Sequence, residues 1–233
     1  MTSFSKAKFV KHEPCPSCGS SDALARYDDG SAYCFAAGCN HFEKATGEVV
    51  QLSTRRKTDM RGVCADIPDR RISKQTCEKF GVTVEFGTDG KVSKHHYPYY
   101  ATDSDSLLGS KVRLVDNKNF LVTGTFEGAG LFGQNTCRGR GKYITVCEGE
   151  IDALSISEMF DRKWDVVSLR SGASAAAKEV KEQLEFLEGY DNIVLCFDND
   201  KAGETAIDAV KDVFSPNKVR ICRLPLKDAN EML

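Results

Sequence analysis

Acidic side chains follow two apolar stretches of the sequence, in a pattern suited to metal-assisted chemistry on phosphates. Asp198 and Asp200 come after NIVLCF (192–197), and Glu148 follows KYITVC (142–147). In an extended chain, side chains at positions i and i+2 lie on one face, so the two aspartates point the same way. Unpaired carboxylates at one place repel each other, so a cation is expected between them. Ligand sets made only of oxygen favour Mg²⁺ or Mn²⁺ over zinc.

These acids have two other interpretations. The segment DNDKAG (198–203) begins like a calcium-binding loop, but Ala202 stands at its fifth position. Its twelfth position, where a bidentate glutamate is needed, is Ala209, so the calcium loop is excluded. The acids could instead cap the helices that follow each strand, and that alternative stays open for any single one of them.

Four of the ten cysteines form two short-spaced pairs, CPSC and CFAAGC, separated by 15 residues. This spacing is typical of a zinc ribbon, in which four thiolates surround one tetrahedral Zn²⁺. His12 or His41 as a replacement for one thiolate, and four metal-free thiols, remain as alternatives. The predicted zinc ligands are Cys15, Cys18, Cys34 and Cys39.

From residue 141 onward, predicted strands and helices alternate along the chain. Near-continuous apolar strands in such an alternation favour a parallel sheet flanked by helices. Ligands of these sheets gather at the carboxyl ends of the strands, so Glu148 and the two aspartates are expected to converge there. The predicted strands are 142–148, 165–169, 192–198 and 218–224, and the predicted helices are 151–160, 173–187 and 201–214.

The remaining sequence divides into three parts, which makes the predicted fold a multi-domain one. Residues 1–52, with short alternating runs, form a small β zinc ribbon, and the polar segment 53–62 is a flexible basic linker. Residues 63–140 form an α+β basic subdomain, fused to the α/β domain of residues 141–233. Within the subdomain a helix is predicted from Ser73 to Gly81, because these residues suit its two caps. Strands are expected around HHYPYYA, SKVRLVD and NFLVTG.

Charge is distributed unevenly along the chain, although the total is only −2. Residues 53–142 carry a net charge of +6, which suits phosphates, and residues 143–233 carry −7, which suits divalent metals. Ordinary solvated surface charge is the alternative. Without an apolar run of 18 residues or a signal-peptide core, we expect a cytosolic protein with no membrane association. No G-x-x-x-x-G-K-[ST] motif occurs, so no helicase motor is expected within these residues.

The segments E-G-x-x-D (148–152) and D-x-D (198–200), about 50 residues apart, resemble the Toprim pattern. That pattern is shared by bacterial primases of the DnaG type, topoisomerases and some repair proteins. The segments SKVRLVDNKNF (110–120), SLxxGASAA (168–176) and KDANE (227–231) extend the resemblance. With the ribbon placed first, essentially the whole chain is similar to the primase half of the bifunctional primase–helicases of short-tailed T-odd phages.

The resemblance implies roles for individual residues. Glu148, Asp198 and Asp200 would be catalytic and, with Asp228, would hold two Mg²⁺ or Mn²⁺ ions. Lysines of the basic subdomain would bind the nucleoside triphosphate or the primer end, which maps onto Lys111, Lys118 and, more weakly, Arg113. The zinc ribbon would read the template. Ser31 stands where members of the family carry a histidine, so the template triplet is not carried over.

The function implied is that of a DNA primase, which makes short RNA primers on single-stranded DNA from ribonucleoside triphosphates by two-metal phosphoryl transfer. Such an enzyme would act in phage DNA replication in the cytosol of the host cell. Its partners would be a replicative helicase, fused or separate, and the DNA polymerase of the replisome. The alternatives are a non-catalytic zinc and Toprim DNA-binding module of the recombination-mediator type, or an inactive primase-like appendage of a helicase. The former lacks a basic subdomain, and the latter has lost cysteines or acids that this chain retains.

Overall fold

The computed structural model describes residues 7–36, 39, 41–47, 49–51, 60–117 and 119–233. The chain separates into two compact units, Met1–Lys57 and Thr58–Leu233. Most of the predicted linker, residues 53–59, lies outside the described residues. None of the helices in the described ranges is long and apolar enough to cross a lipid bilayer.

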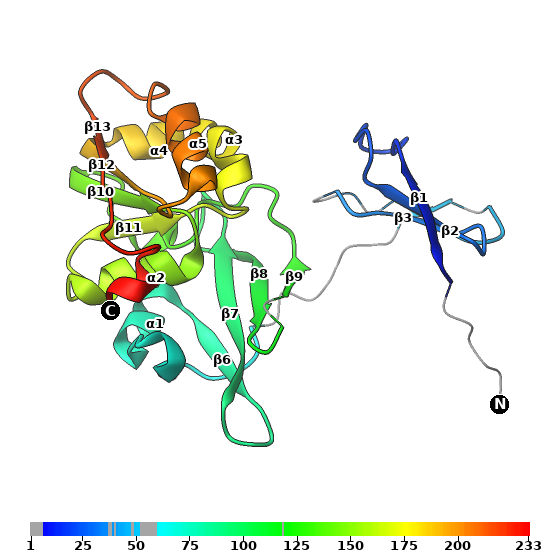
Figure 1. Ribbon diagram of the computed structural model, residues 1–233, viewed down its shortest axis with the longest axis horizontal. Coiled ribbons are helices and arrows are strands. Elements are labelled where there is room, and N and C mark those ends of the chain that lie inside the picture. Colours follow the sequence, from blue (N-terminus) through cyan, green and yellow to red (C-terminus); the bar gives the residue numbers. More distant parts are fainter. Residues whose placement is uncertain (1–6, 37–38, 40, 48, 52–59, 118) are drawn as a thin grey trace. The chain divides into compact units, whose positions relative to one another are not determined.

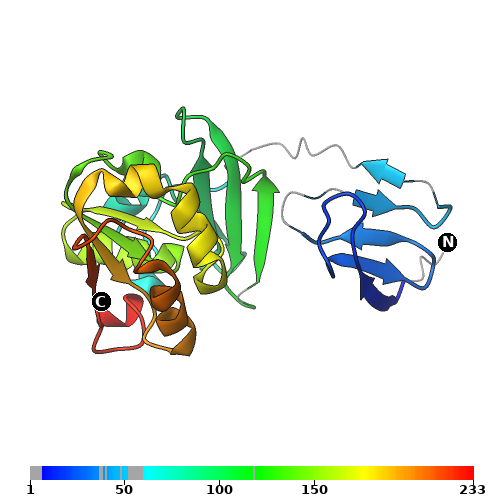
Figure 2. The same ribbon diagram turned by 90° about the horizontal axis from the view of Figure 1, so that it is seen from above.

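The first unit is an antiparallel meander of five short strands, in the order in which they occur in the chain (Figure 2). Its buried apolar core is small and consists mainly of Leu24, Ala32 and three of the cysteines. A core of this size cannot stabilise a fold on its own, which is why the cysteine cluster matters here. The strands are β1 (Phe9–Glu13), β2 (Leu24–Tyr27), β3 (Ala32–Cys34), β4 (His41–Glu43) and β5 (Val49–Gln51).

The second unit begins with a short helix and an antiparallel sheet of four strands in the order β6-β7-β8-β9 (Figure 1). Helix α1 runs over Lys74–Phe80, with the Ser73 side chain accepting a hydrogen bond from Thr76 N at its start. It ends at Gly81, whose φ of 69° suits glycine, so the predicted helix and both caps are confirmed. The strands are β6 (Thr83–Phe86), β7 (Val92–Tyr100), β8 (Leu107–Leu114) and β9 (Phe120–Gly124).

The same unit continues into a parallel sheet of four strands in the order β11-β10-β12-β13, which confirms the predicted α/β architecture. Helix α2 packs on one face of this sheet and helices α3, α4 and α5 on the other (Figure 1). The strands are β10 (Gly141–Cys147), β11 (Asp165–Ser168), β12 (Tyr190–Cys196) and β13 (Val219–Ile221). The helices are α2 (Glu150–Met159), α3 (Ala176–Glu182), α4 (Leu184–Glu188) and α5 (Lys201–Val210).

The antiparallel sheet and the parallel sheet share one buried core through helix α2. Tyr97 and Tyr99 of β7 belong to the same apolar cluster as Leu154 of α2 and Phe132. Phe132 also forms an isolated β-bridge with Ser168 at the end of β11. This shared core fixes the basic strands of residues 63–140 against the acidic half of the unit.

The single helix predicted over 173–187 is wrong in detail, because the structure breaks it into a 3₁₀ turn, α3 and α4. The break lies at Gln183, whose φ of −111° and ψ of 19° depart from helical values. Its side chain accepts a hydrogen bond from Gln134 Nε2 at 3.0 Å. The new direction after Gln183 lets Leu187 of α4 reach the buried core. The four 3₁₀ turns among the described residues are Pro68–Arg70, Gln134–Thr136, Ala173–Ala175 and Asn230–Met232.

Candidate active site

Four cysteine sulfurs of the ribbon lie close enough together to share one metal ion. The Sγ atoms of Cys15 and Cys39 are 3.7 Å apart, and so are those of the other two cysteines. All four lie within 4.8 Å of one another. A tetrahedral zinc ion with bonds of about 2.3 Å separates its sulfur ligands by roughly 3.8 Å, whereas a disulfide brings them to about 2.05 Å. The donor set and its spacing therefore fit one zinc ion held by Cys15, Cys18, Cys34 and Cys39.

Local backbone structure positions the first cysteine pair. Gly19, with a φ of 72°, donates its N–H to Cys15 O at 3.0 Å and closes the turn. Gly38, which precedes the last cysteine of the second pair, lies outside the described residues. His41 Nε2 lies 3.0 Å from Glu43 Oε1, so this ring is engaged with a carboxylate of its own strand.

Glu148 and Asp198 follow neighbouring parallel strands and lie at the same edge of the sheet. Strand β10 ends at Cys147 and β12 at Cys196, and these two residues are paired in register. The chain reaches Glu148 one residue later and Asp198 two residues later. The parallel register therefore sets both acids at the carboxyl ends of the strands, where α/β sheets bind ligands.

Glu148 has one carboxylate oxygen with a partner and one without. Its Oε1 accepts a hydrogen bond from Ala173 N at 3.3 Å. Its Oε2 is buried and has no hydrogen-bond partner in the part of the chain that the structure describes. Gly172, with a φ of 72°, brings the backbone close, since a Cβ there would lie 3.7 Å from Glu148 Oε1. A buried carboxylate oxygen without a partner is costly, and a bound cation would remove that cost.

Two acids at this edge, Asp198 and Asp152, have a raised pKa. Burial, followed by the charges of Glu148 and Asp228, raises the pKa of Asp198 to about 6. Burial, followed by the charge of Asp198, raises the pKa of Asp152 to about 7. Asp152 lies in the first turn of α2 and was missing from the predicted site residues, although it is the last acid of the E-G-x-x-D segment. Carboxylates in such a shared field attract a divalent cation.

Asp200 and Asp228 each have a structural role at one oxygen. Asp200 Oδ1 accepts hydrogen bonds from Ala202 N at 2.9 Å and Gly203 N at 3.0 Å, which caps α5. The capping alternative therefore holds for Asp200. Asp228 Oδ1 accepts from Glu231 N at 2.9 Å. Among the described residues, the four cysteines are the one group of His, Cys, Asp or Glu side chains close enough to hold a metal ion as they stand, so the acids are more widely spaced than the cysteines.

Lys111 of β8 reaches from the basic sheet to the start of helix α2. Its Nζ donates to Glu150 Oε1 at 2.7 Å and to Arg170 O at 2.8 Å. Glu150 is 4% exposed, and its Oε1 also accepts a hydrogen bond from the hydroxyl of Tyr99. Lys111, the predicted nucleotide-binding lysine, is thus held in a buried ion pair. Its partner, Glu150, follows Glu148 by two residues along the chain. Sequence reasoning missed Glu150 and Tyr99 because only tertiary contact assigns them.

Of the two other predicted cations, the structure describes Arg113 but not Lys118. Arg113 is half-buried on the same strand face as Lys111, and its Nε has no hydrogen-bond partner among the residues that the structure describes. An unpartnered guanidinium donor at this position would suit an anionic ligand. Lys118 lies outside the described residues.

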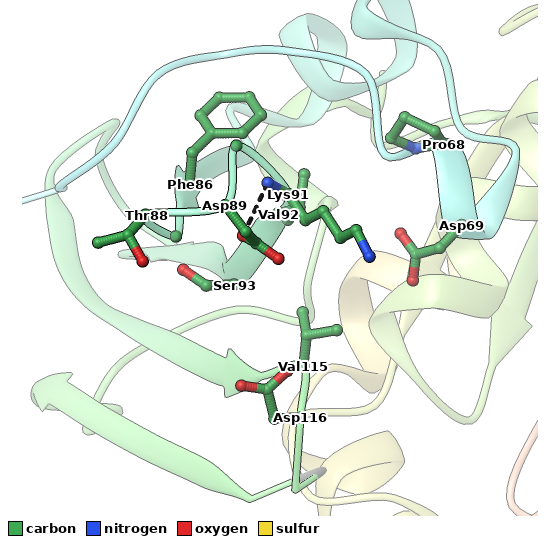
Figure 3. Close-up of a pocket in the computed structure, with 12 residues that line it drawn as sticks. Pro68, Asp69, Phe86, Thr88, Asp89, Lys91, Val92, Ser93, Val115 and Asp116 are labelled. Carbon is green, nitrogen blue, oxygen red and sulfur yellow. Dashed lines mark hydrogen bonds between the residues drawn. The ribbon is translucent and has the colours of Figure 1, made fainter.

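A pocket of about 760 Å³ opens beside the β6–β7 hairpin and contains none of the predicted site residues (Figure 3). Its lining includes three carboxylates, Asp69, Asp89 and Asp116, against one cation, Lys91. That excess of negative charge disfavours phosphate ligands, so we do not assign this pocket as the nucleotide site. The other lining residues are Pro68, Phe86, Gly87, Thr88, Gly90, Val92, Ser93 and Val115.

This chain is similar to known proteins in sequence. A model of the family described as Toprim-like matches residues 145–233. The chain is 40% identical over 240 residues to a DNA helicase/primase of Enterobacteria phage T3, an alignment that covers 96% of this chain. It spans 41% of the length of that relative.

Solved structures show the same similarity. The primase fragment of the bacteriophage T7 primase-helicase is 35% identical with a TM-score of 0.69, covering 96% of this chain and 94% of that chain. A structure of the T7 lagging-strand DNA polymerase interacting with primase domains bound to an RNA/DNA hybrid matches at 40% identity and a TM-score of 0.66. That match covers 73% of this chain and 84% of the other. The DnaG catalytic core, at 16% identity and a TM-score of 0.53, covers 71% of this chain and 66% of that chain and shares the fold.

Proposed function

The chain belongs to the Toprim-containing primase family of the phage primase–helicases, and on that footing we propose that it is a DNA primase. It would join ribonucleoside triphosphates into short RNA primers on a single-stranded DNA template during phage replication. The observation that carries the proposal is the buried Oε2 of Glu148, which has no partner within the described ranges, at the edge where Asp198 lies and Lys111 contacts Glu150. Anionic and cationic groups facing one another are what phosphoryl transfer requires, because it depends on positioning and charge neutralisation.

The acids would hold the metal that the reaction needs. We propose that Glu148, Asp198 and Asp200 hold two Mg²⁺ or Mn²⁺ ions, with Asp228 as a further ligand. Divalent ions of this kind, when bound, lower the pKa of an attacking hydroxyl and neutralise charge on the leaving pyrophosphate. Glu148 offers a free oxygen for this role, whereas Asp200 would bind through the oxygen that does not cap α5.

The basic strand would orient the triphosphate. Lys111 and Arg113, together with Lys118, would contact the phosphates of the incoming nucleotide or the end of the primer. Since Glu150 already pairs with Lys111, the ammonium is preorganised at the site and loses little side-chain entropy when a phosphate arrives. The half-buried Arg113 would supply its Nε, a donor that no other described residue uses.

The first unit would recognise the template. We propose that one zinc ion stabilises it through its four cysteines, as a module of residues 1–52 joined by a flexible basic linker (53–62) to the polymerase part. That part would comprise the basic subdomain (63–140) and the Toprim subdomain (141–233). The partners proposed are a replicative helicase, fused or separate, and the replisome DNA polymerase, in the host cytosol. The names of the T3 and T7 relatives support these partners.

A primer-synthesis assay tests the activity, using random single-stranded DNA, four ribonucleotides with one labelled, and Mg²⁺. The wild type should make short oligoribonucleotides, and Glu148→Gln or Asp198→Asn should lower the yield by at least about 100-fold. Asp191→Asn is the matched control, because this exposed acid lies near the start of β12, away from the end of the strand that Asp198 follows. If the wild type binds single strands but makes no product on any template, the non-catalytic DNA-binding module is the better description.

A further inference from the structure

Phe120 opens the edge strand β9 with an aromatic ring that is 48% exposed. Single exposed apolar residues are common on protein surfaces and need no function. This ring differs because its other side is occupied by a cation: Lys111 Nζ lies 4.9 Å from the centre of the Phe120 ring. An ammonium in this position is attracted to the face of the ring.

The cation beneath the ring is itself fixed. Lys111 is bound to Glu150 Oε1 and to Arg170 O, and its side chain is only 16% exposed. Because the ammonium is held on two sides, the ring that contacts it is restrained as well. A restrained aromatic surface with one open face binds a planar ligand at low entropic cost.

The strand register shows which way the ring is directed. Phe120 pairs with Arg113 in register, and Lys111 of the same strand as Arg113 pairs with Tyr97 of β7. Cross-strand partners lie on one face of a sheet, so Phe120 shares the face from which Lys111 reaches the start of α2. Leu121, 53% exposed, pairs with Val112 and lies on the opposite face.

We propose that Phe120 is a stacking platform for a nucleobase of the single-stranded DNA that passes the site. The inference rests on the proposed function and deepens it by assigning a residue to the bases of the template. A base stacks on an aromatic ring whatever its identity, and the cations beside the ring suit the adjoining phosphates. An open edge strand, with exposed residues on both sides of Phe120, lets a polymer continue past the ring.

The test measures binding separately from synthesis, with the full zinc-loaded chain and fluorescence anisotropy at one fixed salt concentration. Two labelled probes of equal length are used, an oligothymidylate and an oligomer of abasic sites. Phe120→Ala should weaken binding of the oligothymidylate by about ten-fold and leave binding of the abasic strand unchanged. Phe120→Trp should restore the affinity, and Leu121→Ala, on the other face of the same strand, should behave as the wild type.

Equal losses for both probes, no loss for either, or an equal loss in Leu121→Ala would each overturn the proposal. A third probe, ATP, distinguishes the source of the base: weakened ATP binding with unchanged DNA binding would assign the ring to the nucleotide and reject the DNA assignment. If the wild type makes primers but Phe120→Ala binds DNA normally, the inference fails and the primase function stands. If no primers form but base-dependent binding requires Phe120, the function fails and the inference stands.

Discussion

The two compact units differ in how their predicted metal sites relate to their apolar cores. The ribbon has few buried apolar side chains, and three of the four clustered cysteines belong to that small core, while Cys18 is exposed. The second unit has two large apolar clusters, and its acids lie at the edge of a sheet that those clusters already hold together. A metal ion held by the cysteines would therefore contribute to folding, whereas one held by the acids would relieve repulsion in a fold that its apolar clusters already stabilise.

Loss of zinc should produce the largest effect. Structural zinc sites contribute about 10–16 kcal/mol to small domains, more than the ribbon's apolar core can replace. Cys34→Ser should therefore bring the described ribbon amides to the hydrogen-exchange rates of an unfolded chain, with residues 60–233 unchanged. Cys64→Ser, in the second unit, is the control. Ribbon amides that stay protected in Cys34→Ser would show that the core suffices and would break the comparison.

Lys111→Met should destabilise the second unit by about 4 kcal/mol. Removal of one partner from a buried ion pair leaves the other charge, here Glu150 at 4% exposure, without compensation. Urea denaturation followed by Tyr and Trp fluorescence measures the loss. The double variant Lys111→Met/Glu150→Gln should recover much of it, because no buried charge remains. Equal instability of the single and double variants would contradict the ion-pair explanation.

Acid should weaken the second unit through a buried histidine. Burial lowers the pKa of His95 from 6.5 to about 4, so the folded state keeps the ring neutral while the unfolded state takes up a proton. The contribution of His95 to the free energy of unfolding is fully present above pH 6.5 and decreases as the pH falls to 4. The total decrease is about 3 kcal/mol. Chemical denaturation at several pH values, compared with His95→Gln, isolates this contribution. Parallel pH profiles for the two proteins would refute it.

Asp198→Asn should have the smallest effect on stability, and it should raise the stability where the preceding changes lower it. The folded state raises the pKa of Asp198 to about 6, so its charge opposes folding above that pH and the opposition fades towards pH 4. Without divalent cations at pH 7.5, the variant should gain about 1 kcal/mol, a figure reduced for solvent screening at a half-buried group. The gain should disappear at pH 4 and in saturating Mg²⁺. If the metal-free variant were less stable than the wild type, the proposed difference between the metal sites of the two units would be wrong. Asp191→Asn is the control and should not change the stability.

Some features of this protein follow from short-range patterns and were predictable. The cysteine spacing predicts the sulfur cluster, because two short-spaced pairs of thiols are typical of one shared metal ion whatever surrounds them. The Ser73 and Gly81 caps define helix α1 through local backbone hydrogen bonds. Apolar strands that each end in an acid predict Glu148 and Asp198 at one edge, since parallel strands share that edge.

Other features depend on contacts between distant parts of the chain, and no local pattern encodes them. Gln183 breaks a helix that its own neighbours favour, so that Leu187 can enter the core. Lys111 finds Glu150, 39 residues away, only because β7 and β8 pack on helix α2. The raised pKa of Asp152 likewise requires that Asp198 come close and that water be excluded. The sequence by itself determined which residues are candidates for the chemistry, and tertiary packing decided their partners and charges, because burial and long-range pairing exist only in the folded chain.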